Sequence, residues 1–346
     1  MSGQLTMQEA LAKLTDGRDL TEAEAADVMG RIMRGEATPS QIGGVMIALR
    51  MKGETVDEIT GFAEAMRAFA SPVRIECRDL LDTCGTGGSG IHKFNISTTS
   101  AIIAAAAGAR VAKHGNRAMS GKAGSADVLE ALGVNIQLNA EQAAECLERT
   151  GICFLFAQLY HPALKHAAAP RRELGVRTIF NLLGPLANPA GADRQMMGLY
   201  DRSKTETIAR VLKRLGLKRA MVVGSHDGLD EISLSAPTQV SELKDGNVTT
   251  YDITPEDLGL RTVPLGEVKG GDAKENAAII RRVLAGERSA YRDVVLANAG
   301  ACIYVSGRAE TLADGVRLAA ETIDSGRALD KLQQWISATG EVSYVS

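Results

Sequence analysis

The chain carries the sequence Asp82-Thr83-Cys84-Gly85-Thr86-Gly87-Gly88-Ser89-Gly90 directly after the apolar pair Leu80-Leu81. The apolar pair predicts a buried strand, and the four glycines within six residues predict a loop after it. Glycine lets backbone N–H groups approach an oxyanion closely, because no Cβ atom stands in the way. The stretch therefore predicts a strand that ends in a phosphate or diphosphate site, with a plain tight turn as the alternative.

The residues after this loop favour the same interpretation. The segment Asn95-Ile96-Ser97-Thr98-Thr99 precedes an alanine-rich run at 101–107, which predicts a helix that begins at hydroxyl-bearing residues. The first turn of a helix offers unpaired N–H groups and a partial positive charge to an anion. The spacing matches neither the dinucleotide-binding fingerprint nor the P-loop, since no Lys-Ser or Lys-Thr pair follows the last glycine.

A second loop combines glycine with basic and hydroxyl residues. It contains Lys113-His114-Gly115-Asn116-Arg117 and then Ser120-Gly121-Lys122-Ala123-Gly124-Ser125. Such side chains bind phosphate oxygens through charge-assisted hydrogen bonds. By itself the segment could be a solvated basic loop. Beside the first loop, it predicts a substrate with two separate phosphate groups.

Two adjacent carboxylates, Asp230 and Glu231, lie between a glycine turn and an apolar run at 232–234 that we expect to be a strand. An isolated Asp-Glu pair is most often a solvated turn. Magnesium, however, binds carboxylate and hydroxyl oxygens and usually shares its coordination shell with substrate phosphates. If the pair faces the glycine loop, a Mg²⁺ ion that bridges it to a diphosphate becomes the stronger interpretation.

A basic segment at 171–181 contains three arginines within seven residues. They could be charges on a helix surface, but an arginine that faces a cleft offers a planar fork matched to a carboxylate. His161 and His166 lie just upstream. With no third ligand at metal spacing, we interpret both histidines as ordinary polar residues.

The first seventy residues predict helices alone. Apolar residues recur at helical spacing in 42–49 and again in 59–66, and Thr38-Pro39 and Thr55-Val56-Asp57-Glu58 are helix start signals. Four short helices cannot bury all their apolar stripes in one another. Some of these stripes are expected to meet another domain or a second subunit, and an intramolecular cap is equally compatible with the pattern.

From about residue 72 the pattern changes to short β-rich runs that alternate with helical stretches, which predicts an α/β sheet with crossover helices. The expected strands are 80–83, 134–138, 152–156 and 221–224. Residues 161–183 interrupt the alternation with a helical, basic stretch, and 184–191 are expected to be a stiff connector. The chain is thus expected to cross between two domains more than once.

The composition narrows the class of protein. The chain has 346 residues, of which 45% are hydrophobic and 23% charged, as in globular proteins. A net charge of −3 disfavours nucleic-acid binding, which needs an extended basic surface. The five cysteines are an odd number without a Cys-x-x-Cys motif, no run approaches eighteen apolar residues, and no leader pattern opens the chain. A cytoplasmic protein with reduced thiols is the expectation.

Taken together and in this order, these segments resemble the anthranilate phosphoribosyltransferases, within the nucleoside phosphorylase and phosphoribosyltransferase superfamily. The likeness covers nearly the whole chain, and the ordered set is specific although no single piece is. The matching segments are Gly85-Thr86-Gly87-Gly88, Asn95-Ile96-Ser97-Thr98, Lys113-His114-Gly115-Asn116-Arg117, 124–133, 177–186 and Asp230-Glu231.

The resemblance implies an α/β fold class, with a small all-α domain and a larger α/β domain that has a central, mostly parallel sheet. The small domain would comprise 1–71 with a returning segment at 163–184, and the α/β domain would comprise 72–162 and 185–346. Similar proteins are usually homodimers joined through the helical domain. The implied reaction moves ribose 5-phosphate from 5-phosphoribosyl 1-diphosphate to the amine of anthranilate, which releases diphosphate and serves tryptophan biosynthesis.

The resemblance also assigns site residues, without a covalent nucleophile or strong base. The residues expected to bind 5-phosphoribosyl 1-diphosphate are Gly85, Gly87, Gly88, Ser89, Lys93, Asn95, Ser97, Thr98, Lys113 and Ser125. Those expected at anthranilate are Gly85, His114, Asn116 and Arg172. Those expected to hold Mg²⁺, as two ions per active site, are Ser97, Asp230 and Glu231.

The chain departs from the family pattern within the phosphate loops. Ser89 stands where the family usually has aspartate, and Lys93 stands where threonine is common. Gly121 and Ala123 replace two serines, and Ala169-Pro170 replaces a proline followed by an aliphatic residue. Ser89 and Lys93 make the diphosphate site more positive, so we expect tighter diphosphate binding and a weaker dependence on, or inhibition by, Mg²⁺. We expect the loss of these two serine hydroxyls to weaken the binding of the ribose phosphate.

Three alternatives stay open at this point. A related transferase would use a different aromatic acceptor. A pyrimidine nucleoside phosphorylase shares the architecture but binds a nucleoside and free phosphate, and the Asp230-Glu231 pair and the 113–117 segment stand against it. A nucleic-acid-binding relative is disfavoured by the net charge of −3.

Overall fold

The computed structural model describes residues 5–75, 77–87, 90–118 and 122–344. Gly88, Ser89, Ser120 and Gly121, which entered the sequence predictions, lie outside these ranges. None of the helices within the described ranges is both long and apolar enough to cross a membrane.

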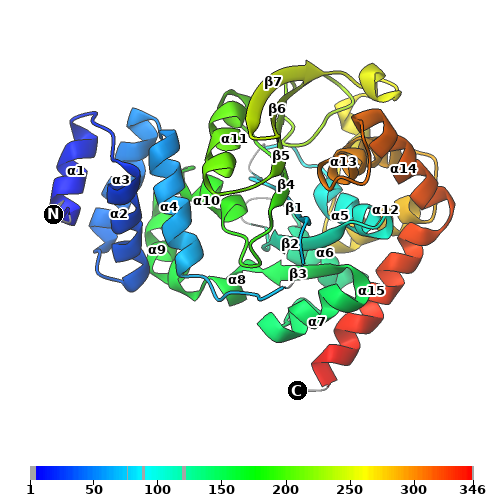
Figure 1. Ribbon diagram of the computed structural model, residues 1–346, viewed down its shortest axis with the longest axis horizontal. Coiled ribbons are helices and arrows are strands. Elements are labelled where there is room, and N and C mark those ends of the chain that lie inside the picture. Colours follow the sequence, from blue (N-terminus) through cyan, green and yellow to red (C-terminus); the bar gives the residue numbers. More distant parts are fainter. Residues whose placement is uncertain (1–4, 76, 88–89, 119–121, 345–346) are drawn as a thin grey trace.

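Four helices form the small domain at the N-terminal end of the molecule (Figure 1). A threonine caps each of them, at Thr6, Thr21, Thr38 and Thr55, and in each the side chain of the N3 Glu or Gln bonds back to the backbone of that threonine. These reciprocal bonds satisfy donors that a helix start otherwise leaves unpaired. The helices are α1 (Met7–Thr15), α2 (Glu22–Arg34), α3 (Pro39–Lys52) and α4 (Val56–Ala68).

Later segments return to this helical domain. Helix α9 (Lys165–Leu174) packs on α3 and α2, and α10 (Phe180–Leu186) packs on α4. The connector expected at 184–191 therefore starts later than predicted, because Gly184 and Pro185 belong to α10. The short helix α8 (Ala157–Tyr160) leads into this excursion.

The larger domain is built on a seven-stranded sheet in the described part of the chain, with the order β3-β2-β1-β4-β5-β6-β7. The pairs from β3 to β5 are parallel, whereas β6 and β7 add an antiparallel edge, so the sheet is mostly parallel as expected. The strands are β1 (Leu80–Gly85), β2 (Arg110–Gly115), β3 (Ile152–Phe156), β4 (Arg194–Gly198), β5 (Arg219–Ser225), β6 (Thr238–Lys244) and β7 (Asn247–Ile253).

Helices cover both faces of this sheet (Figure 1). On β4, Met196 belongs to the core shared with α5 and α13, whereas Met197 belongs to the core that α11 shares with the helical domain. The core of the helical domain therefore continues onto one face of the sheet. The helices are α5 (Ile96–Ala106), α6 (Ser125–Leu132), α7 (Ala140–Thr150), α11 (Thr205–Arg214), α12 (Ala273–Leu284), α13 (Ala290–Val305), α14 (Leu312–Asp324) and α15 (Arg327–Tyr344).

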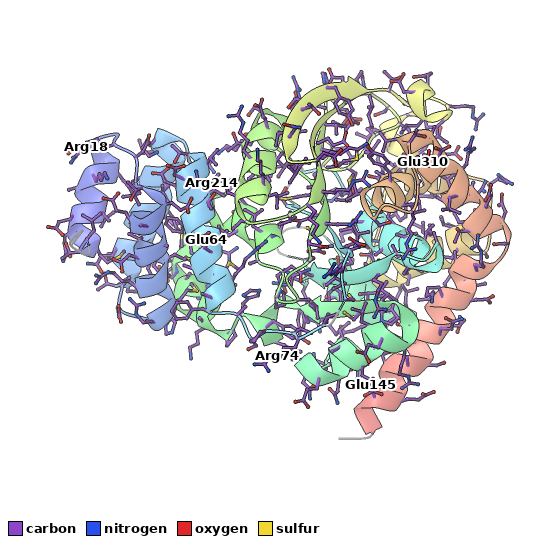
Figure 2. All side chains as sticks on the ribbon, in the orientation of Figure 1. Arg18, Glu64, Arg74, Glu145, Arg214 and Glu310 are labelled. Carbon is purple, nitrogen blue, oxygen red and sulfur yellow. The ribbon has the colours of Figure 1, made fainter. Side chains whose placement is uncertain are left out.

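Polar contacts hold the same junction. Arg214 of α11 forms ion pairs with Glu22 and Asp57 of the helical domain, and Figure 2 labels Arg214 where the two domains meet. The Nη1 atom of Arg67 donates to the Leu215 carbonyl oxygen at the end of α11 over 3.4 Å. The two domains thus share both apolar and charged contacts.

Two predicted strands are wrong. Residues 134–138 belong to no helix or strand and pair with no strand in the described chain. Their alternation is real, since Val134, Ile136 and Leu138 are buried, but the N–H of Asn135 donates to the Thr339 hydroxyl instead of a neighbouring strand. Residues 232–234 also lie outside any strand.

Helices α13 and α14 cross so closely that glycine is required at the contact. A Cβ atom on Gly315 would lie 2.2 Å from the Gly300 carbonyl oxygen. Backbone cannot yield as a flexible side chain can, so α13 would have to move.

We therefore expect Gly315→Ala to lower the free energy of unfolding by about 2 kcal/mol or more, because overpacking of this kind costs about 1–3 kcal/mol. Gly340→Ala on α15 is the matched control, because a Cβ atom there meets nothing within 4 Å. An alanine in a helix interior gains up to about 1 kcal/mol over glycine. Urea unfolding of both variants measures the difference, and equal stabilities would contradict the close crossing.

Candidate active site

A cleft of about 370 Å³ opens at the carboxyl ends of the parallel strands, on the side of the helical domain. Loops after β1, β2 and β5 line one part of it, and α4, α9 and α10 line another. The loops after β1 and β4 leave the centre of the sheet, where strand order reverses and α/β folds commonly bind ligands. Residues from the sequence predictions that line the cleft are Gly85, Gly87, Lys93, Asn95, Ser97, Lys113, His114, Asn116, Ser125, Asp230 and Glu231.

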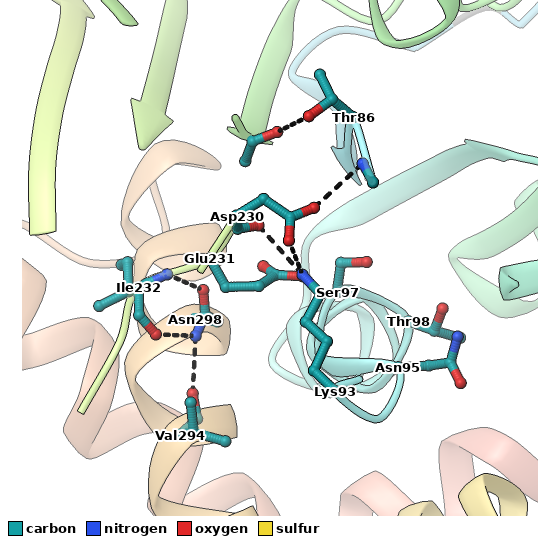
Figure 3. Close-up of polar contacts among 12 residues, drawn as sticks. Thr86, Lys93, Asn95, Ser97, Thr98, Asp230, Glu231, Ile232, Val294 and Asn298 are labelled. Atoms are coloured by element: carbon teal, nitrogen blue, oxygen red, sulfur yellow. Dashed lines mark hydrogen bonds and ion pairs between the residues drawn. The ribbon is translucent and has the colours of Figure 1, made fainter. Parts of the chain in front are cut away.

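The glycine loop and the acidic pair meet directly. The N–H of Gly87 donates to Asp230 Oδ2 over 3.1 Å (Figure 3). A Cβ atom on Gly85 would approach the same oxygen to 3.0 Å, and one on Gly198 would lie 2.0 Å from the Asp230 carbonyl oxygen. The absence of side chains at these glycines therefore lets the acidic pair sit against the loop, as the sequence interpretation requires.

Lys93 joins the same group. Its Nζ atom lies 3.0 Å from Asp230 Oδ1 and 2.8 Å from Glu231 Oε1 (Figure 3). Burial lowers the pKa of this lysine, but the two carboxylates outweigh burial and hold the pKa above its ordinary value. Burial and the neighbouring Asp230 raise the pKa of Glu231, while Lys93 opposes them.

Asn298 of α13 holds the backbone next to the acidic pair, and the sequence interpretation missed it. Its Oδ1 accepts from the Ile232 N–H over 2.9 Å, and its Nδ2 donates to the Ile232 carbonyl over 2.9 Å. Nδ2 also donates to the Val294 carbonyl of its own helix. A lone asparagine in an apolar helical run gives no sequence signal for this role, because its partner is 66 residues away.

The end of β2 supplies a buried lysine, and Asn95 supplies an amide from the residue before α5. Lys113 is buried, and its Nζ donates to the Thr83 carbonyl and to the Ser97 hydroxyl over 3.4 Å. Asn95 Nδ2 donates to the Ala123 carbonyl over 3.2 Å, which ties the first loop to the second. These contacts bring both predicted phosphate loops to one cleft.

Thr98 does not line the cleft. It is fully buried, and its hydroxyl donates to Ser125 Oγ over 3.2 Å. The reason is its place in the first turn of α5, where Ser97 faces the cleft and the next residue turns inward. Thr98 therefore contacts the lining residue Ser125 and does not itself line the cleft.

The arginine that lines the cleft is not the one that the sequence analysis expected at anthranilate. Arg172 is exposed and lies outside the cleft lining, whereas Arg171 lines the cleft and stacks over Phe180, 5.2 Å from the ring centroid. Successive residues of a helix point about 100° apart, so only one of the two can face the cleft. The sequence shows the pair but not which member turns inward.

The same end of the cleft is apolar. Met66 of α4, Leu164, Phe180 and Pro185 line it, and the sequence interpretation named none of them as site residues. Helical periodicity predicted Met66 as a core residue. An apolar wall beside one guanidinium suits a flat aromatic acid.

Two buried histidine rings lie close together, and one of them, His114, lines the cleft. The rings of His114 and His161 lie 5.0 Å apart between centroids. Burial, with a smaller contribution from His161, lowers the pKa of His114 to about 3, and burial lowers the pKa of His161 to about 4. Both rings are therefore neutral near pH 7, and His161 has a structural role that the sequence did not reveal.

A pH-dependent stability follows from His161. In the unfolded chain a histidine binds a proton near pH 6.5, but His161 in the folded chain does so only near pH 4. Stability from this group is therefore fully present above pH 6.5 and is lost as the pH falls toward 4. Burial raises the pKa of Asp82 to about 6. The stability contributed by this carboxyl therefore increases as the pH falls, which opposes the effect of His161.

We expect the wild type to lose up to about 1.4 kcal/mol more per pH unit than His161→Gln between pH 6 and pH 4.5. Asp82 is present in both proteins, so its effect cancels. Urea unfolding at several pH values gives the two slopes. Parallel slopes would show that His161 titrates normally in the folded chain.

Comparison with known proteins agrees with this architecture. The model described as the glycosyl transferase family, a/b domain, matches residues 77–329, and the one described as the helical bundle domain of that family matches residues 8–70. Anthranilate phosphoribosyltransferase of Brevibacillus brevis is 53% identical over 337 residues, which cover 97% of this chain and 99% of that protein. The enzyme of the same name from Thioalkalivibrio sulfidiphilus is 54% identical, with coverage of 97% and 99%.

Solved structures give the same result. The crystal structure of anthranilate phosphoribosyltransferase from Thermus thermophilus superimposes with a TM-score of 0.91 at 45% identity and covers 95% of this chain and 99% of that one. The Saccharomyces cerevisiae enzyme in complex with PRPP and Mg gives a TM-score of 0.90 at 26% identity, with coverage of 98% and 99%. The chain therefore belongs to the anthranilate phosphoribosyltransferases of this glycosyl transferase family.

Proposed function

We propose that this cleft transfers ribose 5-phosphate from 5-phosphoribosyl 1-diphosphate to the amine of anthranilate, releasing diphosphate and N-(5-phosphoribosyl)anthranilate for tryptophan biosynthesis. One observation carries the proposal. The glycine loop, the acidic pair and the basic second loop converge at one end of the cleft, and Arg171 stands beside an apolar wall at the other. The first end matches a sugar with two anionic groups, and the second end matches an aromatic carboxylate.

At the sugar end, the backbone N–H groups of the glycine loop hold the diphosphate. Lys113, Asn95, Ser97 and Ser125 hold the ribose phosphate from the second loop and from the start of α5. Charge-assisted hydrogen bonds of this kind are about twice as strong as neutral ones. We include Gly88 and Ser89 in this proposal as residues that bind 5-phosphoribosyl 1-diphosphate, as the family resemblance implies.

The acidic pair fits a cation. Asp230 and Glu231 are buried, line the cleft and already have the ammonium group of Lys93 between their carboxylates. The yeast relative was solved with PRPP and Mg. Asp230, Glu231 and Ser97 would hold Mg²⁺ here, and the ion when bound stabilises the negative charge of the departing diphosphate.

At the acceptor end, Arg171 pairs with the carboxylate of anthranilate, and the ring lies on Met66 and Phe180. The Nε2 atom of His114 has no hydrogen-bond partner among the described residues, and the ring is neutral. A neutral imidazole can accept a hydrogen bond from the amine, and Asn116 lies on the same loop. These contacts aim the amine nitrogen at C1 of the ribose.

The reaction then needs positioning and charge stabilisation, without a covalent nucleophile. The C1–oxygen bond to diphosphate breaks as positive charge grows on the ribose ring, and the amine nitrogen forms the new bond to C1. The nitrogen then releases one of its two protons to water or to the departing diphosphate. Well-oriented reactants gain up to about 7–11 kcal/mol over free encounter. Closure of the helical domain over the cleft keeps water from intercepting the ribosyl cation.

The assembly and location are part of the same proposal. We place the chain in a homodimer joined through the helical domain, formed by 1–71 with 163–184, and in the cytoplasm. Met51 of α3 is 83% exposed and Val176 after α9 is 46% exposed, which supports an interface on this domain. All five cysteine thiols are free, as in a reducing compartment.

The adjacent arginines provide the test. With 5-phosphoribosyl 1-diphosphate and Mg²⁺ present, we expect Arg171→Ala to raise the KM for anthranilate about 10- to 100-fold, since a hydrogen-bonded charge contributes about 1.5–3 kcal/mol. Arg172→Ala, the matched control on the same helix, should change KM less than about threefold, since its side chain is exposed. The loss of anthranilate fluorescence measures both. The reverse ranking would move the carboxylate site to Arg172, and no turnover by the wild type would refute the proposed function.

A further inference from the structure

The ammonium group of Lys93 is held by the acidic pair itself. Besides the two carboxylate oxygens, Nζ donates to the Asp230 carbonyl oxygen over 3.2 Å. Two hydrogen bonds, to Glu231 Oε1 and to the Asp230 carbonyl oxygen, and an ion pair with Asp230 Oδ1 therefore fix the ammonium at this pair. Figure 3 shows the side chain extending from the segment before α5 to the acidic pair.

The backbone around Lys93 fixes this position. Lys93 forms an antiparallel bridge with Lys269, and the Gly270 N–H donates to the His92 carbonyl over 2.9 Å. The next residue, Phe94, is fully buried with its ring edge against Tyr291, 5.1 Å between centroids. The hydrogen bond of His92 on one side and the buried ring of Phe94 on the other therefore hold the backbone of Lys93 so that its side chain reaches the acidic pair.

Lys93 at this position conflicts with the binding of two divalent cations at the acidic pair. Lys93 neutralises one of the two negative charges of Asp230 and Glu231 and occupies one oxygen of each. A Mg²⁺ ion needs short contacts to oxygen in near-octahedral geometry. An ion on the same oxygens would have to displace the ammonium or lie within a few ångströms of it, where like charges repel.

We propose that Lys93 supplies a positive charge that a second divalent cation would otherwise bring, so that the substrate complex takes up one divalent ion per active site instead of two. The inference rests on the proposed function, because it concerns the complex with 5-phosphoribosyl 1-diphosphate. The one remaining ion would be held by the diphosphate together with Asp230, Glu231 and Ser97.

Manganese binding tests this without measuring turnover. Free Mn²⁺ is followed by electron paramagnetic resonance during titration of the protein saturated with 5-phosphoribosyl 1-diphosphate, with anthranilate absent. We expect one Mn²⁺ per chain for the wild type and two for Lys93→Met, which keeps the length but removes the charge. The second ion should bind at least about tenfold more tightly to Lys93→Met than to the wild type, because the repulsion is removed.

Two further variants control for charge and folding. Lys93→Arg keeps the charge and should bind one ion. Lys269→Met removes the lysine paired with Lys93 in the same bridge, but its side chain is exposed, so it should also bind one. Circular dichroism checks that each variant is folded.

Two Mn²⁺ ions in the wild type would overturn the inference even if Lys93→Met failed to fold, and so would equal counts in the wild type and Lys93→Met. The fluorescence assay on the same wild-type preparation separates the two proposals. Turnover of anthranilate with two bound ions refutes the role of Lys93 alone, whereas no turnover refutes the proposed function.

Discussion

The site depends on the contact between the glycine loop and the buried acidic pair. Burying two adjacent carboxylates is costly unless each is paired or hydrogen-bonded. Gly87 donates to Asp230, Lys93 pairs with both carboxylates, and Asn298 holds the next backbone unit through both Ile232 polar groups. Segments from three distant parts of the sequence are therefore fixed together before any ligand arrives, which is the preorganisation that charge stabilisation requires.

The two domains contribute different chemistry to the cleft. Loops at the carboxyl ends of the sheet provide N–H groups, a buried lysine and carboxylates, whereas the helical domain and α10 provide apolar contacts. The core of the helical domain continues onto one face of the sheet, and α5 and α13 pack in a second core on the other face, so the shared sheet positions both halves of the site. This arrangement brings a charged sugar and a flat aromatic acid to a shared boundary.

Sequence reasoning predicted most of the fold because its signals are local. The capped N-terminal helices, β3 and the helix α5 follow from periodicity and start signals, and the family pattern predicted the acidic pair at the glycine loop. Residues 134–138 alternate like a strand, but no strand edge is available to them, and alternation does not show what the backbone bonds to. The antiparallel edge, β6 and β7, was not predicted.

The choice between Arg171 and Arg172 depends on helix rotation, and the inward turn of Thr98 has the same cause. Asn298 and the pairing of Lys93 with the acidic pair involve partners 66 and 138 residues away. Residue identity alone carries no information on such distances. The departure from the family pattern at Lys93 was visible in the sequence, but its ion pairs needed the structure.

A crystal structure with bound 5-phosphoribosyl 1-diphosphate tests the central claim most directly. The account predicts that the diphosphate lies between the backbone at 85–87 and the Asp230-Glu231 pair, with the 5-phosphate at the second loop near Lys113 and Ser125. A diphosphate bound elsewhere, with the acidic pair turned away from the glycine loop, would contradict it.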